Sequence, residues 1–260
     1  MASPNQSPWD VWDFNLKIAA NKMTGVTGEN KYAINPNINT TTEDVWQEGG
    51  ILNFLSLAET INVVSSSSDD DGNPLGDGAR TVTLYGVDGN FQPLKETVVM
   101  NGMTNVVTQS AFLRINRMRV TTVGDDGINA GNITATASSA GTVQATISTG
   151  LGTTLKSQFT IADGYTGFLS NLALGTENND QALVTMQTRI PGGAWIVIYR
   201  LNINDASYYQ PFPIPLKISS KSDIRLQAIK IAGSGTISVT TNYEVYIVKN
   251  EYVTQNNIFS

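Results

Sequence analysis

The chain has 260 residues, a formal net charge of −6 and an isoelectric point near 4.6, and only 15% of its residues are charged. An acidic chain of this kind is not typical of nucleic-acid-binding proteins, which normally present a basic face, so we expect no nucleic-acid partner. Because the sequence contains no histidine and no cysteine, Ser-His-Asp and Cys-His catalysis, disulfides and thiolate metal sites are excluded.

The composition predicts an all-β protein. Thr, Ser, Asn and Gly are abundant, whereas the residues that favour long surface helices are scarce. No apolar run approaches the length of a membrane span, and the start of the chain, "MASPNQSPWDVWDF", lacks the basic and apolar segments of a signal peptide. We therefore expect neither a membrane partner nor classical secretion.

Residues 1–42 are predicted to form an N-terminal arm with a short amphipathic helix. Its apolar residues recur at helical spacing: Trp9, Trp12, Leu16, Ala19 and Met23. Ser7 is the expected N-cap and Pro8 the first-turn residue. The helix either packs on its own domain or docks on another subunit through Trp9, Trp12 and Leu16, because tryptophans are good anchors. The next segment, "GVTGENKYAINPNINTTTED", has little periodicity and is predicted to be an extended connector.

Residues 43–155 are predicted to form a first β domain. The stretch "GARTVTLYGVDGNFQPLKETVVMNG" alternates apolar and polar residues on both sides of "VDGN", which indicates a β-hairpin with Gly89 at positive φ. Short strands follow in "SAFLRINRMRVTTV", "GNITATAS" and "GTVQATIS". Their regular spacing favours a sandwich or barrel over alternating strands and helices.

Residues 156–260 are predicted to form a second β domain. "QALVTMQTRIPGGAWIVIYRLNI" has the pattern of a hairpin, and "DIRLQAIKI" and "TISVTTNYEVYIV" that of a further pair, in which Ile237 to Ile247 place alternate residues on one face. The three prolines of "YYQPFPIPLKI" predict an edge strand or a crossover. The expected fold is thus two antiparallel β-sandwich domains, jelly-roll or immunoglobulin-like, after the arm. One continuous sandwich is the alternative.

Two groups of acidic residues are candidate sites. Asp69, Asp70, Asp71 and Asp77 lie in a Gly-rich loop that could hold calcium, but their spacing does not complete an EF-hand, and a solvated loop is favoured. Glu43, Asp44 and Glu48 surround Trp46 and could serve a glycan hydrolase, but nothing places two of them across a cleft. We therefore predict no metal, no cofactor and no enzyme activity.

Aromatic and basic residues supply two candidate contact sites. Tyr208, Tyr209 and Phe212 could form a glycan-binding platform, or equally fill the core or touch another subunit. In "LRINRMR", alternation places Arg117 and Arg119 on one strand face and Arg114 on the other. Three arginines in an acidic chain suggest salt bridges across an interface with a partner, although an exposed strand face would look the same.

The β region resembles a group of virion structural proteins of tailed bacteriophages from marine and freshwater sources. The resemblance covers roughly residues 43–232 and is carried by a series of stretches that occur in order: "EDVWQEGGILNFLS", "NVVSSSS", "GARTVTLYGVDGNFQPLKETVVMNG", "FLRINRMRV", "NAGNITATAS" and "LGTTLKSQFTIADGYTGFLSNLAL". It implies a non-enzymatic particle component, and it carries over no functional residues.

The leading hypothesis is therefore a capsid decoration, head-fibre or minor capsid protein, located in a virion that assembles in the host cytoplasm. Its expected partners are other virion proteins, a major capsid protein or a fibre partner, together with copies of itself, with a trimer favoured by analogy only. The alternative hypothesis is a tail or head fibre module that recognises cell-surface glycan through Tyr208, Tyr209 and Phe212.

Overall fold

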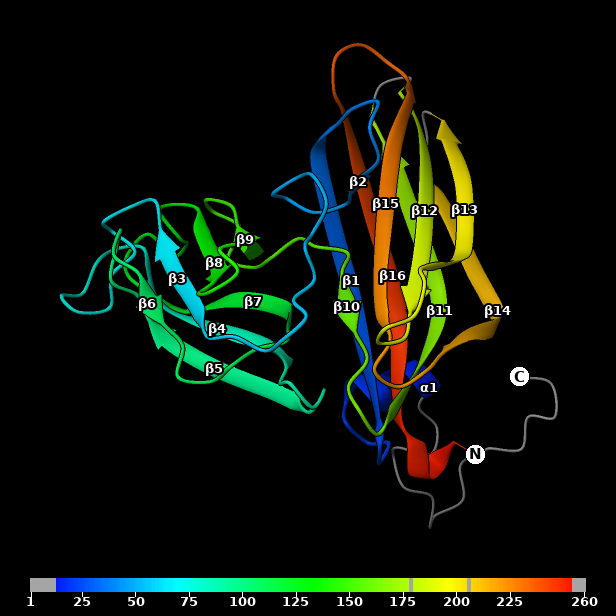
Figure 1. Cartoon of the computed structure of the whole chain (residues 1–260), viewed down its shortest axis with the longest axis horizontal. Coiled ribbons are helices and arrows are strands. Elements are labelled where there is room, and N and C mark those ends of the chain that lie inside the picture. Colours follow the sequence, from blue (N-terminus) through cyan, green and yellow to red (C-terminus); the bar gives the residue numbers. More distant parts are fainter. Residues whose placement is uncertain (1–12, 178–179, 205–206, 254–260) are drawn as a thin grey trace, which may run out of the picture.

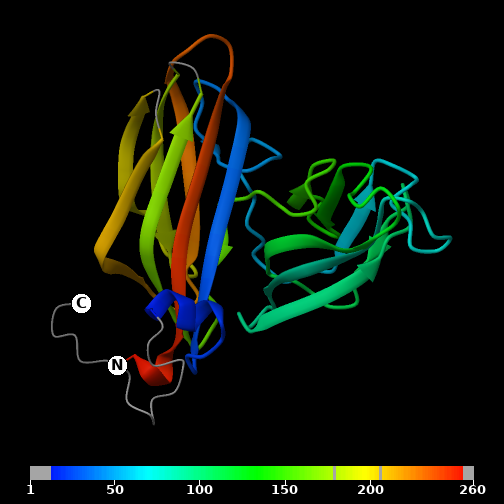
Figure 2. The ribbon, with the colours of Figure 1, turned by 180° about the vertical axis from the view of Figure 1, so that it is seen from behind.

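The computed structural model describes residues 13–177, 180–204 and 207–253, and it places their strands in two β bodies that lie side by side (Figures 1 and 2). The larger body contains residues 14–44 and 159–252, and the inserted body contains residues 61–147. The segments 45–60 and 148–158 connect them. The inserted body thus interrupts the larger one, whose strands come from both ends of the chain.

The larger body consists of two antiparallel sheets that share one apolar core. The first has the order β1-β16-β11-β14, formed by Val26–Ile38, Ile237–Lys249, Tyr165–Thr176 and Tyr208–Ile218. The second has the order β10-β15-β12-β13, formed by Phe159–Thr160, Asp223–Ala232, Gln181–Arg189 and Ile196–Asn204, and β2 (Glu43–Asp44) also pairs with β15. Leu172, Leu226 and Tyr243 are fully buried between the sheets.

The inserted body has the same construction on a smaller scale. One sheet has the order β6-β3-β8-β9, formed by Val106–Val107, Ile61–Ser65, Ile133–Ala137 and Val143–Ile147. The other has the order β5-β4-β7, formed by Pro93–Val99, Ala79–Val87 and Arg114–Val123. Their core buries Leu84, Phe112 and Met118 completely. The all-β class and the antiparallel pairing predicted from the sequence are confirmed.

A short N-terminal helix is present, but it starts later than the sequence suggested. Helix α1 spans Phe14–Ala19, and its N-cap is Asp13, whose side chain accepts a hydrogen bond from the Leu16 N–H. It packs on the outside of the first sheet, where the Phe14 ring meets Tyr246 edge-on at 5.4 Å. The buried residue is Ile18, and Leu16 is 48% exposed. Within the described part of the chain, no helix is long and apolar enough to cross a membrane.

The prediction of a connector after the helix is wrong for most of the segment that begins at Gly25. Residues Val26–Ile38 form the long strand β1, which pairs with β16 from Val26 opposite Val248 to Ile38 opposite Ile237. The inward side chains of this strand include two polar ones, Lys31 and Asn35, both buried. A search for alternating apolar residues misses such a strand, because its buried positions do not read as apolar. Whether residues 1–42, 43–155 and 156–260 fold as independent units stays a prediction.

Other strand predictions are confirmed, with two local differences. The hairpin of β4 and β5 forms as expected, but positive φ occurs at Phe91 and not at Gly89, because the Asp88 carboxylate accepts hydrogen bonds from the Asn90 and Gln92 N–H groups and shapes the turn itself. The strands β15 and β16 are consecutive but do not pair, since their loop crosses from one sheet to the other. The proline-rich β14 is an edge strand, as predicted.

We predict that Gly86→Ala destabilises the inserted body. A Cβ at this position in β4 would lie 1.9 Å from the Arg114 carbonyl oxygen of β7, so backbone must move. The expected loss is about 1–3 kcal/mol of unfolding free energy, measured by urea denaturation. Gly28→Ala is the matched control, because its Cβ would make only ordinary contact with Ile18 at 3.4 Å. Equal effects of the two substitutions would contradict the close approach of β4 and β7.

Candidate functional site at the junction of the two bodies

One buried carboxylate, that of Asp223 on β15, ties the inserted body to the larger one. Arg114 of β7 donates to both of its oxygens, from Nε at 2.9 Å and from Nη2 at 3.0 Å. Arg189 of β12 and the Thr160 hydroxyl donate to it as well. The remaining Arg114 nitrogen, Nη1, donates to two backbone carbonyls, those of Leu55 and Leu113. The ion pair is thus fully hydrogen-bonded, as a buried charge requires.

Arginines and aromatic rings alternate beside this carboxylate. Arg114 and Arg189 both lie over the Phe54 ring, at 5.0 and 4.8 Å from its centre. Arg189 also lies 4.4 Å from the centre of Trp195, and Arg225 lies 3.9 Å from it. Since Phe54 belongs to a connecting segment and Trp195 follows β12, the stack extends the contact between the bodies with cation–π interactions.

The two connecting segments run side by side and are joined to each other. The Ser157 N–H donates to the Val45 carbonyl at 3.0 Å, and Trp46 and Lys156 form a β-bridge. The Lys156 ammonium is buried and donates to the carbonyls of Ile115 and Gln144 in the inserted body. Two mutually paired segments leave less freedom than one linker, so the junction holds the bodies in a fixed relation.

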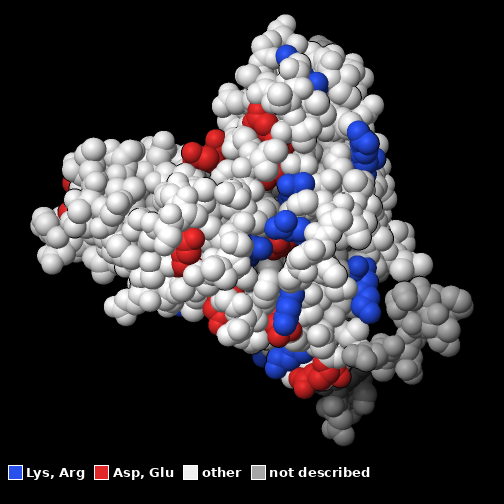
Figure 3. All heavy atoms as spheres, in the orientation of Figure 1, with Lys and Arg blue, Asp and Glu red and all other residues white. Residues whose placement is uncertain are grey.

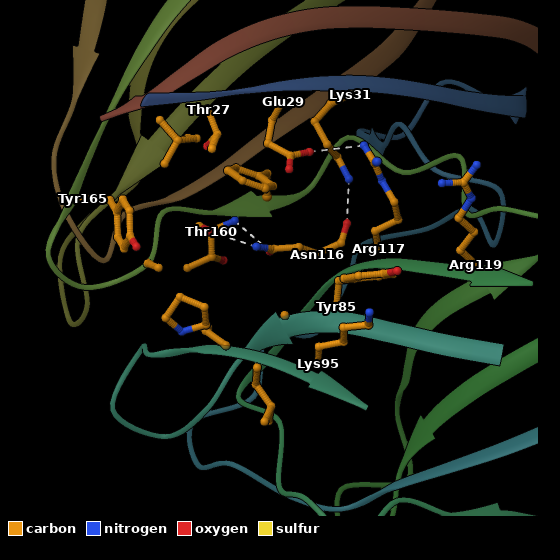
Figure 4. A pocket seen from close by; sticks show the side chains of 17 residues that line it. Thr27, Glu29, Lys31, Tyr85, Lys95, Asn116, Arg117, Arg119, Thr160 and Tyr165 are labelled. Atoms are coloured by element: carbon orange, nitrogen blue, oxygen red, sulfur yellow. Dashed lines mark hydrogen bonds and ion pairs between the residues drawn. The ribbon is translucent and has the colours of Figure 1, made fainter. Parts of the chain in front are cut away.

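A cleft of about 530 Å³ opens between the bodies beside this junction (Figure 4). The larger body supplies Thr27, Glu29 and Lys31 from β1, together with residues of β10 and β11. The inserted body supplies the opposite wall from β4, β5 and β7. Figure 4 shows the side chains of the two walls pointing toward one another across the cleft.

The cleft is strongly cationic, although the chain as a whole is acidic. Its charged lining residues are Lys31, Lys95, Arg117, Arg119 and Glu29. Glu29 is neutralised by Arg117, whose Nη2 lies 3.3 Å from its carboxylate and also donates to the Asn30 carbonyl. On the face drawn in Figure 3, Lys and Arg are spread along the larger body, and some of them lie beside Asp and Glu near the junction.

Lys31 lies at the floor of the cleft. Its side chain is buried, its ammonium donates to the Asn116 carbonyl at 2.6 Å, and it lies 5.8 Å from the centre of the Phe159 ring. Burial lowers the pKa of Lys31 well below its ordinary value, and the nearby Arg117 and Lys156 charges lower it further, against the opposing effect of Glu29.

The structure separates the three arginines that the sequence offered as one contact site. Arg114 is buried in the ion pair with Asp223, whereas Arg117 and Arg119 share a face, as alternation predicted, and line the cleft. Leu16 is exposed on α1. Trp9 and Trp12 lie outside the described residues. Arg114 and Arg117 therefore bridge two parts of one chain, and their contact with a partner stays a prediction.

The three proposed glycan-binding aromatics do not form one platform. The Tyr208 hydroxyl bonds to that of Tyr199 at 3.0 Å, and the Phe212 ring packs edge-on against Tyr199. Tyr209 points elsewhere and is 63% exposed. Alternation along β14 explains the split, because successive side chains of a strand point to opposite faces.

The acidic candidates are engaged in local structure. Glu43 accepts hydrogen bonds from Asn35, Asn39 and the Gly50 N–H, and Trp46 is buried. Asp70 is fully buried and accepts from four donors: the Ser65 hydroxyl and the N–H groups of Ala79, Ala130 and Gly131. In the part of the chain that the structure describes, no group of three or more acidic, His or Cys residues could hold a metal ion.

Sequence reasoning missed the cleft because its walls are far apart in the chain. Glu29 and Lys31 precede the inserted body, and Lys95 lies on β5 in its middle. The one local signal was the alternation that put Arg117 and Arg119 on one face. Nothing in the sequence told which other strand that face would meet.

We predict that Arg114→Gln costs about 3–5 kcal/mol of unfolding free energy, because it leaves the buried Asp223 carboxylate without its bidentate partner. Arg117→Gln is the matched control. It also removes an ion pair between the bodies, but the Arg117 and Glu29 side chains are 34% and 36% exposed, and such pairs contribute at most about 1 kcal/mol. Urea denaturation of both variants measures the difference, and similar losses would argue against the central role of Asp223.

Stability should rise between about pH 7 and pH 9 through Lys156. Burial lowers the pKa of Lys156 from 10.5 to about 7, against the nearby Asp44 and Asp223 charges, which raise it. Between these values the unfolded chain binds more protons than the folded one, so the unfolding free energy rises with pH, by up to about 1.4 kcal/mol per pH unit. Lys156→Met should reduce this slope in urea denaturation at several pH values. An identical slope in the variant would refute the assignment.

Comparisons with known proteins identify no family. No family model matches the chain, and no curated protein matches it. Among solved structures, one described as the structure of infectious bursal disease virus Gx strain covers 87% of this chain and 73% of its own at 9% identity and a TM-score of 0.24. The crystal structure of the infectious bursal disease virus VP2 subviral particle covers 88% and 74% at 10% identity and a TM-score of 0.22. The chain thus has weak structural similarity to proteins of virus particles, too weak to carry an argument.

Proposed function

We propose that this chain is a structural protein of a virion, a capsid decoration, head-fibre or minor capsid component that works through shape and contact. The observation that carries the proposal is the rigid tie between the two bodies. A buried carboxylate, its partner Arg114 from the inserted body and two paired segments hold them in one relation. The resemblance of the β region to tailed-phage virion proteins supports the same role. In this proposal each pair of sheets is a sandwich of jelly-roll or immunoglobulin-like type.

The side of the larger body that faces away from the inserted body supports contact with neighbouring subunits. Its edge strands β13 and β14 lie next to each other there (Figure 1). They expose large apolar side chains: Ile196 at 62%, Val197 at 48%, Tyr209 at 63% and Ile214 at 85%. The β14 prolines lack N–H groups and oppose strand addition, so a neighbour would meet side chains and not a free strand edge.

The lining of the cleft supports a non-enzymatic role. Hydrolysis of a glycosidic bond uses two carboxyl groups about 5–9 Å apart. Among its lining residues the cleft has one carboxylate, Glu29, and that group is paired with Arg117. Two of the proposed glycan-binding side chains, Tyr208 and Phe212, pack on Tyr199. Glycan recognition by these two residues together with Tyr209 stays a prediction.

The proposed role predicts that removal of residues 1–12 abolishes incorporation into particles while the protein still folds. The deletion is restricted to these residues because β1 begins at Val26 and belongs to the first sheet. The measurement is quantitative mass spectrometry of purified particles made with the full-length or the shortened chain, with circular dichroism as the control for folding. Normal incorporation of the shortened chain would argue against anchoring by the arm, and absence of the full-length chain from particles would refute the proposed function.

We further expect self-association through the β13–β14 side. Ile214→Asp should weaken self-association by about tenfold or more, because it places a charge in an apolar contact. A tenfold change corresponds to about 1.4 kcal/mol of association free energy. Leu57→Asp is the matched control, since Leu57 is also exposed, at 75%, but lies on a connecting segment. Sedimentation velocity over a range of concentrations measures the effect. An equal response of both variants would rule out this side as the contact.

A further inference from the structure

We propose that the cleft between the two bodies binds an anionic saccharide, a sugar ring that carries a carboxylate or a sulfate group. This inference concerns a different site from the aromatic residues of β14 and does not depend on the virion role. It rests on the charge of the cleft, on the polar groups there that have no partner, and on its aromatic lining.

The charge of the cleft selects an anion. Three cationic side chains, those of Lys95, Arg117 and Arg119, face one carboxylate, and Arg117 already neutralises that carboxylate. Arg119 has no hydrogen-bond or ion-pair partner for its side chain among the described residues, and Lys95 contacts only the face of the Tyr85 ring, at 5.4 Å. Because these cationic groups are gathered in one cleft, they attract a small anion to it, although the chain as a whole is acidic.

The floor of the cleft has hydrogen-bond donors to spare. The Lys31 amino group carries at least two N–H donors, and it directs one to the Asn116 carbonyl, its one hydrogen-bond acceptor within the described chain. A further N–H of this group is therefore available to a ligand. An anionic oxygen placed beside Lys31 and within reach of Arg117 would accept it. The anionic group of the ligand is therefore assigned to the floor.

The remaining lining fits a sugar ring. Tyr85 on β4 and Tyr165 on β11 present aromatic rings to the cleft, and flat rings cover sugar faces at little entropic cost. The hydroxyl groups of Thr27, Tyr85 and Tyr165 have no hydrogen-bond partner among the described residues, so they are available to the hydroxyls of a sugar. A volume of about 530 Å³ is within the range of small-molecule sites, roughly 300–1,000 Å³.

The test titrates the full-length protein with four probes by isothermal calorimetry: glucuronate, a sulfated glucose, unmodified glucose and inorganic sulfate. We expect the two anionic sugars to bind at least about tenfold more tightly than glucose, and their affinity to fall as salt is added. They should also bind more tightly than inorganic sulfate, which lacks the ring. A preference for glucuronate or for the sulfated sugar would identify which anionic group the site takes.

Variants locate the binding. Arg119→Ala and Lys95→Ala should each weaken binding of the anionic sugars by about tenfold or more, since each removes a charged donor that faces the ligand. Both residues are exposed, so the variants should fold. Arg200→Ala is the matched control, an exposed arginine on β13 that does not line the cleft. Tyr165→Phe should weaken the sugars but not inorganic sulfate.

Three results would overturn the proposal. Binding of the anionic sugars no tighter than that of glucose would remove the role of charge. Equal binding of inorganic sulfate and of the sugars would leave an anion site without a sugar site. The third result is an Arg119→Ala variant whose self-association in sedimentation changes while its sugar binding stays intact. The cleft would then be a contact between copies of the chain.

Discussion

The relation between the two bodies depends on the Asp223 carboxylate. A carboxylate buried between two β bodies must be fully hydrogen-bonded, and Asp223 meets this requirement only when β7 of the inserted body brings Arg114 against β15. Arg189, the Phe54 and Trp195 rings and the paired connecting segments then gather around the same point. The cleft is a consequence of this tie, because its walls come from the surfaces that the tie leaves facing each other.

Much of the secondary structure could be predicted from the sequence, because most strands follow the simple rule that one face is apolar. The last long strand shows this clearly, since Val239, Tyr243 and Val245 are all buried on one side. The rule failed at β1, whose buried positions include Lys31 and Asn35. It also failed for the order of strands, because alternation describes a strand and not its neighbours. Consecutive strands such as β15 and β16 therefore looked like a pair and were not.

The candidate site was much less predictable than the strands. Its residues are ordinary in sequence, with no motif around Lys31, Lys95 or Arg119. They become a site only because β1 and the inserted body are brought together by contacts between residues about a hundred positions apart, as in the pair of Arg114 and Asp223, whose sequence separation is 109. The arginines of β7 did stand out in an acidic chain. The structure places Arg114 and Arg117 in ion pairs between the two bodies of one molecule, and their contact with a partner stays a prediction.

The insertion of one body into the other has a consequence for synthesis on the ribosome. All strands of the inserted body, from Ile61 to Ile147, are made consecutively, so this body can fold while translation continues. The first sheet of the larger body has no such freedom, because its inner strand β16, between β1 and β11, is made after every other described strand. The strand β1, with Lys31 and Asn35 on its inward face, therefore waits unpaired through almost the whole of translation. The earliest of the described strands is thus among the last of them to find its partner.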